Sequence, residues 1–526
     1  MIVDAYTVVG GLTVSPEPMG FPELSAQMDK TGVGMAAVTS LRGLNADGRK
    51  GNEHLFAGAA ADGRLIPIGV VGPRVASADL PSVVSDCVAS GAAGLAFHVL
   101  PHTSLASLAS RKAFAEIARP GLPLVACSLT GSGLPTQLAE MTADLGCPLY
   151  LAGAFYHLFE ELLAVLEEHG HVYVDPSWLP TPGAIDLLVE RGGPDRVLYA
   201  SAAALRPMQP ALNVVLDAEL DEVTKRKILA TNALRLFGRN KEADRAEAAP
   251  QPLPAVKVPA TPAIDVHNHF GEIPMLSAST RDVDAIEHFA RRAGFEYSVC
   301  SSYFAYYDDM DEGNREMLRK IESRPGLLGS PVINPVHMEA SIRWLEAFAE
   351  NDRLAHATIT PDTVLDRGGS EDYLRLFAEA AKRGVPIFFN GPNWDFTRLP
   401  RYPMGPGYAP FVRGGSAAEL EMLREVGRRH PDLPVILGHG MGEDGIRLAV
   451  DTPNIYLELS GSYPYRDVLR RAIDTVGADR VVFGTDMDLI LPSFALGIYY
   501  EADLSPEEDR LIMAKTARGI LRMPRG

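Results

Sequence analysis

Cysteine is scarce in this sequence, and its few copies are not paired. The 526 residues include only Cys87, Cys127, Cys147 and Cys300, which are scattered and form no CxxC motif. This spacing excludes a disulfide framework or a zinc knuckle and is typical of buried thiols in a reducing compartment. The first residues, MIVDAYTVVG, contain no basic region and no small-residue cleavage site, so no secretory signal is expected. We therefore expect a cytoplasmic protein.

Long apolar runs and an excess of positive charge are also lacking. No apolar run approaches the roughly 20 residues that a membrane-spanning helix requires. The chain has 49 lysine and arginine residues against 67 aspartate and glutamate residues, which gives a formal net charge of −18. This acidity disfavours nucleic acid and anionic membranes as partners, although local arginines or a metal can still bind an anionic molecule. We expect a small-molecule substrate, no nucleic acid and no membrane.

An internal repeat runs through the chain. IVDAYTVVG near the start matches AIDVHNHFG near the middle, which aligns Asp4 with Asp265. Four further matches follow in the same order, and they pair Asn52 with Asn314, Pro123 with Pro386, Pro148 with Pro434, and Asp195 with Asp479. Collinear matches of this kind predict a tandem duplication with one insertion in the second copy. Each copy is close to the length of about 250 residues that is typical of a (β/α)₈ barrel.

Each copy alternates short apolar runs with amphipathic stretches. Runs such as PIFF, PVILG and RVVFG are typical of strands buried on both faces, and AAELEMLREVGRRH has helical periodicity. This alternation predicts an α/β fold of two tandem (β/α)₈ TIM-like barrels, with an open doubly wound sheet as the alternative. The predicted domains are residues 1–240 and 263–526. Residues 241–262, rich in Pro and Ala, lack periodicity and are predicted to be an extended linker.

Polar side chains close several predicted strands of the second copy. His267 and His269 are spaced i, i+2, so both leave one face of a strand. His439 and Asp486 each follow a later apolar run. Because a parallel barrel builds its active site at the carboxyl ends of its strands, we expect these side chains to meet in a divalent-metal site. An exposed turn for HNH and a helix N-cap for Asp486 are the alternatives.

These motifs resemble the amidohydrolase superfamily, in particular the branch of aminocarboxymuconate-semialdehyde and hydroxybenzoate decarboxylases and related hydrolases. IDVHNHF resembles the first strand of that family, LPVILGHGMG the sixth and RVVFGTDM the eighth. The resemblance implies that His267, His269 and Asp486 hold one divalent metal ion, with Zn²⁺ expected first and Mn²⁺ or Fe²⁺ as alternatives. It also implies that His439 polarises the substrate or binds a second metal, and that Asp486 accepts a proton from the activated water.

The second copy departs from this family at its fifth strand. PIFFNG places Asn390 where the family has a further histidine, and a neutral amide binds divalent ions less well than imidazole. The fourth strand, ATITPD, offers Thr358 and Thr360 and no lysine, so a two-metal centre on a carbamylated lysine is not expected.

The first copy has lost every ligand position. Tyr6, Val8, Cys127, Gly153 and Ala202 stand at the places of His267, His269, Asn390, His439 and Asp486. A buried core thiol is a better interpretation of Cys127 than a nucleophile, because no acid or histidine is identifiable beside it. Since members of the family commonly dimerise, the first copy is expected to be a structural partner in an intramolecular pseudo-dimer, with further oligomerisation left open.

Two segments are candidates for substrate binding. Asn390 is itself a candidate, and the insertion after it contains Trp394, Arg398 and Arg413, whose aromatic and cationic groups suit a planar or carboxylated substrate. Tyr303, in SSYFAYYDD, would line the pocket at the second strand. An ordinary surface loop and packing of the barrel rim are the respective alternatives.

Three functions are compatible with these residues. We expect a metal-dependent hydrolase that acts on a small carboxylated or cyclic substrate. A non-oxidative decarboxylase using the same site is the first alternative, and a decayed binding or scaffold protein is the second. Gly440–Gly445 also fits the G-x-G-x-x-G pattern of a dinucleotide site, but the motif comes late in its domain and is absent from the first copy.

Overall fold

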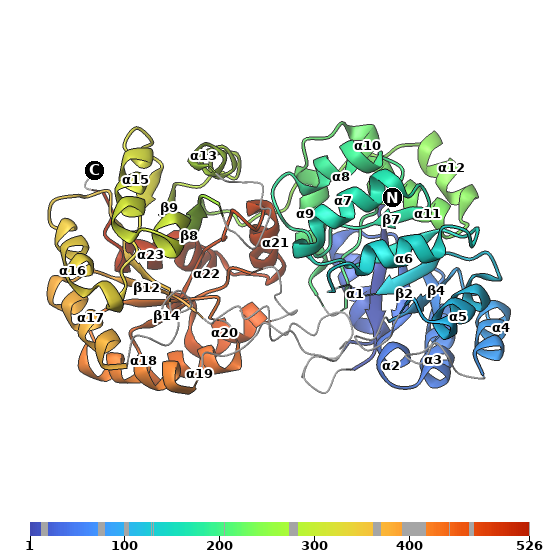
Figure 1. Cartoon of the computed structure of the whole chain (residues 1–526), viewed down its shortest axis with the longest axis horizontal. Helices are drawn as coiled ribbons and strands as arrows, with labels where there is room; N and C mark the ends of the chain where they lie inside the picture. Colours follow the sequence, from blue (N-terminus) through green and yellow to red (C-terminus); the bar gives the residue numbers. More distant parts are fainter. Residues whose placement is uncertain are drawn as a thin grey trace. The chain divides into compact units, whose positions relative to one another are not determined.

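The chain divides into two compact units, of which the first ends at Lys257 and the second begins at Val258. The computed structural model describes residues 1–11, 19–71, 79–98, 105–127, 129, 131–204, 206–272, 282–360, 370–391, 417–440, 442–461 and 468–524. In each unit helices surround a set of parallel strands (Figure 1). None of the helices in these residues is both long and apolar enough to cross a membrane.

The first unit is built on a parallel sheet with the strand order β1-β2-β3-β4-β5-β6-β7. The strands are β1 (Val3–Val9), β2 (Met35–Ser40), β3 (Leu65–Val70), β4 (Gly94–Phe97), β5 (Leu124–Cys127), β6 (Leu149–Ala152) and β7 (Val172–Val174). The helices are α1 (Phe21–Thr31), α2 (Leu41–Asn45), α3 (Gly48–Ala61), α4 (Leu80–Ala89), α5 (Leu108–Ala118), α6 (Leu134–Thr142), α7 (Phe159–Glu168), α8 (Ala184–Gly192), α9 (Met208–Asp217), α10 (Glu222–Arg226), α11 (Asn232–Leu236) and α12 (Asn240–Ala248).

This sheet closes into a barrel. Residues 197–204 take the place of a last strand, because Val197 forms a parallel bridge to Val174 on one side. On the other side, the backbone N–H of Ala5 donates to the carbonyl of Tyr199 at 2.8 Å. The segment therefore joins β7 to β1.

The second unit repeats this architecture. Its strands are β8 (Ile264–Phe270), β9 (Tyr297–Ser302), β10 (Leu327–Gly329), β11 (Ala357–Ile359), β12 (Ile387–Asn390), β13 (Val435–Gly438), β14 (Ile455–Glu458) and β15 (Val481–Val482). Its helices are α13 (Val283–Arg292), α14 (Tyr303–Tyr307), α15 (Met310–Ile321), α16 (Met338–Ala347), α17 (Ser370–Arg383), α18 (Ala417–Arg429), α19 (Glu443–Asp451), α20 (Val468–Val476), α21 (Pro492–Glu501), α22 (Pro506–Arg510) and α23 (Thr516–Ile520).

Two connections close the second barrel. Val332 forms a parallel bridge to Thr358, which links the β8–β10 sheet to the β11–β15 sheet. Val266 N–H donates to the carbonyl of Phe483 at 3.1 Å, which links β8 to the end of β15. The predicted pair of tandem (β/α)₈ barrels is confirmed, and the open doubly wound sheet is wrong. The pairing of the barrels as a pseudo-dimer stays a prediction.

The predicted extended linker is wrong in its first part. Residues 240–248 form α12, since KEADRAEA consists of good helix formers with one aspartate. The helix is also anchored, because Ala243 is fully buried and Arg235 forms ion pairs with Asp244 and Glu247. The proline-rich residues that follow, 250–262, contain no helix or strand.

Local contacts are duplicated along with the barrels. The side-chain amide of Asn52 donates to the carbonyl of Val70 and accepts from its N–H, both at 2.7 Å. Asn314 makes the same pair of bonds with Val332, both at 2.8 Å. These matching contacts fasten α3 to the end of β3 and α15 to the segment after β10. They support the tandem duplication at the level of single side chains.

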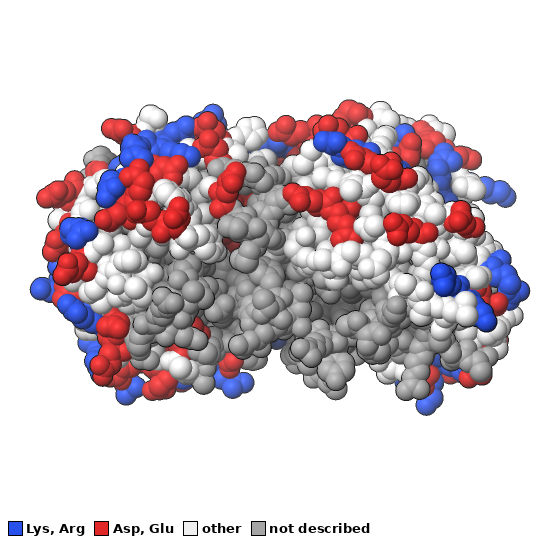
Figure 2. Space-filling view, viewed as in Figure 1, with Lys and Arg blue, Asp and Glu red and all other residues white. Residues whose placement is uncertain are grey.

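Charged side chains are interspersed on the surface. Figure 2 shows acidic side chains, with lysines and arginines among them, over the described part of the visible face of both units. Apolar side chains such as Ile264, Val266, Phe388 and Ile436 fill the interior of the second barrel. Because these strands are buried on both faces, a polar side chain within them needs a bonding partner or a ligand.

Candidate metal centre

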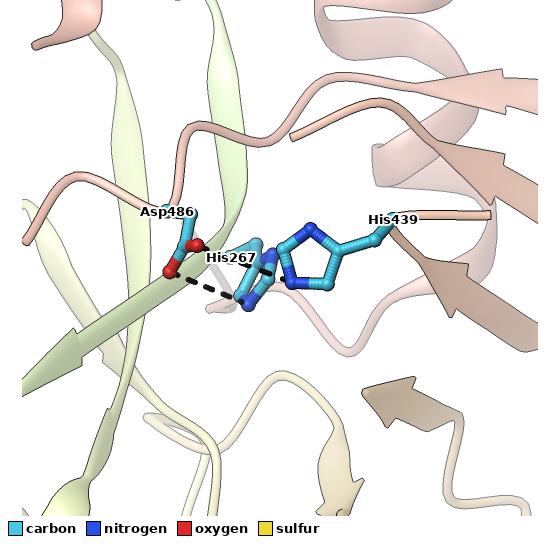
Figure 3. A group of neighbouring side chains, drawn as sticks. All are labelled: His267, His439 and Asp486. Carbon is cyan, nitrogen blue, oxygen red and sulfur yellow. Dashed lines mark ion pairs between the residues drawn. The ribbon is translucent and has the colours of Figure 1, made fainter. Parts of the chain in front are cut away.

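Three histidines and one aspartate meet at the carboxyl ends of the strands in the second barrel. His267 and His269 lie on β8, while His439 follows β13 and Asp486 follows β15. The Nε2 atoms of His267 and His269 are 2.8 Å apart, and they lie 3.9 and 3.7 Å from Asp486 Oδ1. His439 Nε2 lies 4.0 Å from Asp486 Oδ2 (Figure 3). The four side chains thus face one common point.

A backbone irregularity in β8 helps to aim the first two histidines. The pairing of β8 with β9 shifts register between Asp265 and Asn268. The buried carboxylate of Asp265 holds this kink, because it accepts hydrogen bonds from His267 N–H and from the N–H and hydroxyl of Thr485. Such irregularities redirect side chains at strand ends. The contacts also tie the end of β8 to the segment that carries Asp486.

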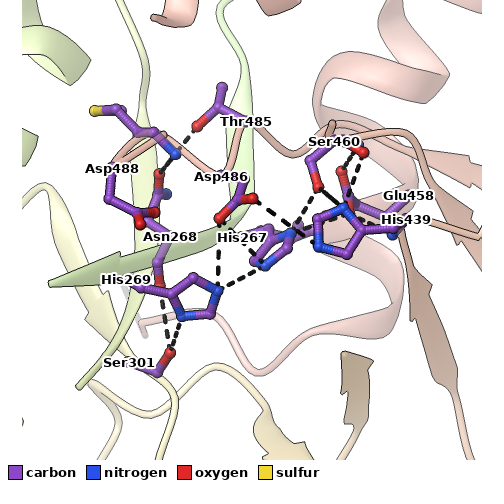
Figure 4. A network of polar contacts seen from close by, with 12 residues as sticks. His267, Asn268, His269, Ser301, His439, Glu458, Ser460, Thr485, Asp486 and Asp488 are labelled. Carbon is purple, nitrogen blue, oxygen red and sulfur yellow. Dashed lines mark hydrogen bonds and ion pairs between the residues drawn. The ribbon is translucent and has the colours of Figure 1, made fainter. Parts of the chain in front are cut away.

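Each imidazole is held through its Nδ1 atom, away from the common point (Figure 4). His267 Nδ1 lies 3.1 Å from Glu458 Oε2 and 2.8 Å from Ser460 Oγ. His269 Nδ1 lies 2.7 Å from Ser301 Oγ, and His439 Nδ1 lies 3.0 Å from the carbonyl of Ser460.

These contacts select one tautomer. A carboxylate or a carbonyl can only accept a hydrogen bond, so His267 and His439 carry their proton on Nδ1. Their Nε2 lone pairs then point to the centre, which is the arrangement in which histidine binds a metal. Burial favours the same neutral form, since it lowers the pKa of His267, His269 and His439, the first two well below the usual value.

The centre has an excess of buried carboxyl groups. Burial raises the pKa of Asp486 well above its usual value, and the nearby carboxyl of Asp488 adds to the effect. Burial also raises the pKa of Glu458, and it brings the pKa of Asp488 to about 7. In the described part of the chain, no lysine or arginine forms an ion pair with these three groups. A bound cation would offset their charge, so the residues present fit a divalent metal ion.

The spacing of the donor atoms also suits a metal. Nitrogen ligands about 2.0–2.1 Å from a tetrahedral zinc ion lie about 3.3 Å from one another. The distance between the Nε2 atoms of His267 and His269 and the distances from each imidazole to Asp486, 2.8–4.0 Å, bracket this value. The donor atoms of His267, His439 and Asp486 all lie within 4.8 Å of one another. His439 therefore fits the ligand set as well as the predicted His267, His269 and Asp486.

The other predicted site residues have different outcomes. Tyr303 is buried at the centre, with its ring centroid 4.9 Å from that of His269. Asn390 ends β12, is partly buried, and makes no described contact with the histidines. Trp394, Arg398 and Arg413 lie outside the described residues. The proposed contact of an arginine with a carboxylated substrate therefore stays a prediction.

Backbone conformation is unusual at two site residues. His439 and Asp486 have φ angles of 53° and 58°, in the left-handed region that residues other than glycine seldom adopt. This conformation costs of order 1 kcal/mol or more per residue and is found mainly at functional sites. The equivalent Gly153 and Ala202 have φ angles of 65° and 61°, so the first barrel keeps the same backbone path.

The first barrel lacks the chemistry of the second. Its described residues contain no comparable cluster of histidines and carboxylates. A Cβ atom at Gly153, the counterpart of His439, would lie 2.9 Å from the ring of Trp178. Burial raises the pKa of Cys127 to about 12, which agrees with a core thiol and disfavours a nucleophile. Trp178 thus fills the space that a site histidine would need.

The sequence did not predict that Glu458, Ser460 and Ser301 hold the histidines. A usable signal existed for Glu458. VYVDPS in the first copy aligns with IYLELS in the second, so Asp175 and Glu458 are equivalent buried acids at a strand end. Asp175 accepts from Gly153 N–H at 2.8 Å, as Glu458 does from His439 N–H at 3.2 Å. The second barrel adds a contact between Glu458 and His267 to this shared bond.

Glu458→Gln is expected to weaken metal binding by about 10- to 100-fold, since loss of a partner that orients a ligand typically has this effect. The amide keeps the shape of the side chain but removes the charge that holds the Nδ1 proton of His267. Competition with a chromophoric chelator would measure the affinity. Asp175→Asn is the matched control in the first barrel and should leave it unchanged. Equal affinities for Glu458→Gln and the wild type would contradict the assigned role.

Comparisons with known proteins agree with two copies of one unit. A family model described as Amidohydrolase matches residues 44–239 and 264–523, and no curated protein matches. Among solved structures, 2,6-dihydroxybenzoate decarboxylase from Rhizobium is 17% identical (TM-score 0.41; 49% of this chain, 98% of that one). 5-Carboxyvanillate decarboxylase from Sphingomonas paucimobilis is 14% identical (0.41; 50% and 100%). A manganese-bound dihydroxybenzoic acid decarboxylase from Polaromonas sp. is 18% identical (0.39; 49% and 96%).

Proposed function

Since the chain belongs to the amidohydrolase family, we propose that its second barrel is a metal-dependent hydrolase of a small carboxylated or cyclic substrate. The observation that carries this proposal is the convergence of three imidazole Nε2 atoms on Asp486. Each Nδ1 atom is occupied elsewhere, so the donor set is preorganised for a cation. The first barrel has the same backbone path and none of these donors. The fold can therefore form without them.

The side chains have distinct roles in this proposal. His267 and His269 hold the divalent cation together with Asp486. When bound, such a cation lowers the pKa of water and polarises a substrate oxygen. Asp486 Oδ2, on the side facing His439, accepts the proton of the attacking water and passes it to the leaving group.

His439 is proposed to act as a ligand or as a proton acceptor. Its Nδ1–H is used by the carbonyl of Ser460, so its Nε2 atom presents a lone pair. In this tautomer it donates a hydrogen bond to a substrate only after Nε2 has been protonated. The role of an electrophile, which the family resemblance implied, therefore requires a protonation that burial disfavours.

A decarboxylase is the second candidate, because aromatic rings border the centre. The ring centroids of Tyr303 and Tyr306 lie 4.9 and 5.2 Å from that of His269. Such a surface suits a planar aromatic acid, whose carboxylate would face the cation. Hydrolysis and decarboxylation would use the same ligands and differ in their products.

Metal analysis followed by product analysis tests the proposal. We expect about one divalent ion per chain after dialysis, since the described residues contain one cluster of this kind. Chelation should abolish turnover, and Zn²⁺ or Mn²⁺ should restore it. A panel of amides, lactones and aromatic acids is then assayed for hydrolysis products and for released CO₂. Release of CO₂ without hydrolysis would establish the decarboxylase, while absence of metal and of turnover would favour a binding protein.

A further inference from the structure

The duplication provides an internal comparison for the buried polar residues of the second barrel. Residues that the fold needs should persist in the first barrel, and residues that serve only the metal centre should be lost with its ligands. Asp265 persists as Asp4, which makes the matching bonds to Tyr6 N–H and to Ser201. Glu458 persists as Asp175, the equivalent buried acid of the first barrel. These carboxyl groups therefore belong at least in part to the fold.

Asp488 and Tyr303 follow the opposite pattern. The alignment of RVLYASAAA with RVVFGTDMD places Ala204 opposite Asp488. Tyr303 begins α14 directly after β9, and Leu41 begins α2 directly after β2 in the same way. Both polar side chains are thus replaced by apolar ones in the barrel that has lost the histidines and Asp486. The first barrel forms the same backbone without these two side chains, so the fold does not require Asp488 or Tyr303.

Asp488 has an unusual environment for a carboxylate. It is 1% exposed, and its Oδ2 atom accepts a hydrogen bond from the hydroxyl of Tyr303 at 2.5 Å. Its Oδ1 atom is buried and has no hydrogen-bond partner in the described part of the chain. A buried carboxylate oxygen without a partner is costly, so this oxygen calls for a ligand.

Figure 4 shows the side chains of Asp488 and Asp486 beside each other near the ring of His269. A cation bound by Asp486 would therefore lie close to the carboxyl of Asp488, whose oxygens are suitable ligands for a divalent ion. The ring of Tyr303 packs against His269, and its hydroxyl donates a hydrogen bond to Asp488. The carboxyl of Asp488 therefore lies beside His269 and Asp486, two of the proposed ligands.

We propose that Asp488 is a further metal-binding residue, oriented by the Tyr303 hydroxyl, which supplies a negatively charged oxygen to a centre whose fifth strand ends in the neutral Asn390. This inference rests on the proposed metal centre. An added carboxylate changes the preference of the site as well as its strength, because oxygen ligands favour Mn²⁺ more than imidazole ligands do. The proposed donor set thus combines imidazole and carboxylate groups and accommodates manganese as well as zinc.

The test compares wild type, Asp488→Asn and Tyr303→Phe in the full-length chain. Affinities for Zn²⁺ and Mn²⁺ are measured by chelator competition, and the Tm of the metal-free proteins is measured in parallel. Asp488→Asn should lower the Mn²⁺ affinity by about 100-fold and the Zn²⁺ affinity less, as expected for loss of an oxygen ligand. Its metal-free Tm should be close to that of wild type, because the amide oxygen of asparagine can still accept the hydrogen bond of the Tyr303 hydroxyl. Tyr303→Phe should weaken Mn²⁺ binding by about 10-fold, since it removes an orienting bond.

The outcomes separate this inference from the proposed function. If wild type binds metal and Asp488→Asn binds Mn²⁺ equally well, the role of Asp488 is wrong and the metal centre stands. A lower metal-free Tm with unchanged affinity would show that Asp488 is a structural residue. If wild type binds neither ion, the proposed function fails and this inference fails with it. Should Asp488→Asn not fold, an unchanged Mn²⁺ affinity of Tyr303→Phe would overturn the proposal.

Discussion

His267→Ala is expected to release the metal ion and to lower turnover by about three orders of magnitude, because a bound cation supplies several kcal/mol of transition-state stabilisation. His267 is central to the site, since its Nε2 atom is 2.8 Å from that of His269 and its Nδ1 atom contacts Glu458 and Ser460. Metal content by mass spectrometry and kcat on the substrate found in the panel are the measurements.

Tyr6→Phe is the matched control for this substitution. Tyr6 occupies the place of His267 in the first barrel and is buried, so its variant should change Tm more than metal content or kcat. Retention of metal and activity in His267→Ala would show that the centre lies elsewhere. A loss of metal in Tyr6→Phe, with the fold intact, would show that the first barrel takes part in binding.

Asp486→Asn is expected to lower kcat by roughly 10²- to 10⁴-fold, the range that a positioned general base contributes. Asparagine has nearly the same shape, but it cannot accept the proton of water and carries no charge. The backbone should remain in place, because Asp486 N–H donates to the carbonyl of His267 at 2.8 Å whichever side chain is present. Kinetics of the metal-loaded variant measure the effect, and near-wild-type kcat would exclude Asp486 as the base.

The pH dependence of stability gives this variant a second readout. Burial raises the pKa of Asp486 in the folded metal-free protein well above its value in the unfolded chain. Ionisation therefore favours unfolding, and the metal-free wild type should lose stability as pH rises from the unfolded pKa towards the folded one. Asp486→Asn should lack this component. A fall of Tm over the same pH range that is equal in both proteins would contradict the assigned environment of Asp486.

The sequence was sufficient to predict both barrels and the convergence of the predicted ligands. Alternation of apolar runs and amphipathic stretches reports on local structure, and the rule that parallel strands end at one edge then brings His267 together with Asp486. The helix α12 was not predicted, because the prolines after Ala248 suggested an extended linker for the whole segment. Helix propensity over residues 240–248 alone would have favoured the helix.

Contacts around the ligands were harder to predict. Glu458 bonds His267 across a separation of 191 residues, and no local pattern encodes which strand-end acid will meet which imidazole. The left-handed backbone at His439 was equally hidden, since few residues other than glycine adopt it and a single histidine does not predict it, although histidine is enriched there. Its counterpart Gly153 was the available clue. A glycine in one copy can mark a strained position in the other.

Trp178 also bears on how the two copies came to differ. A Cβ atom at Gly153 would lie 2.9 Å from the Trp178 ring, so no histidine can return to that position while the tryptophan remains. Trp178 is itself nearly fully buried, and removing it would leave a cavity. Reversal would thus require an intermediate that is less stable than either end point. At this position of the first barrel, a change from glycine to histidine therefore requires a change of Trp178 as well.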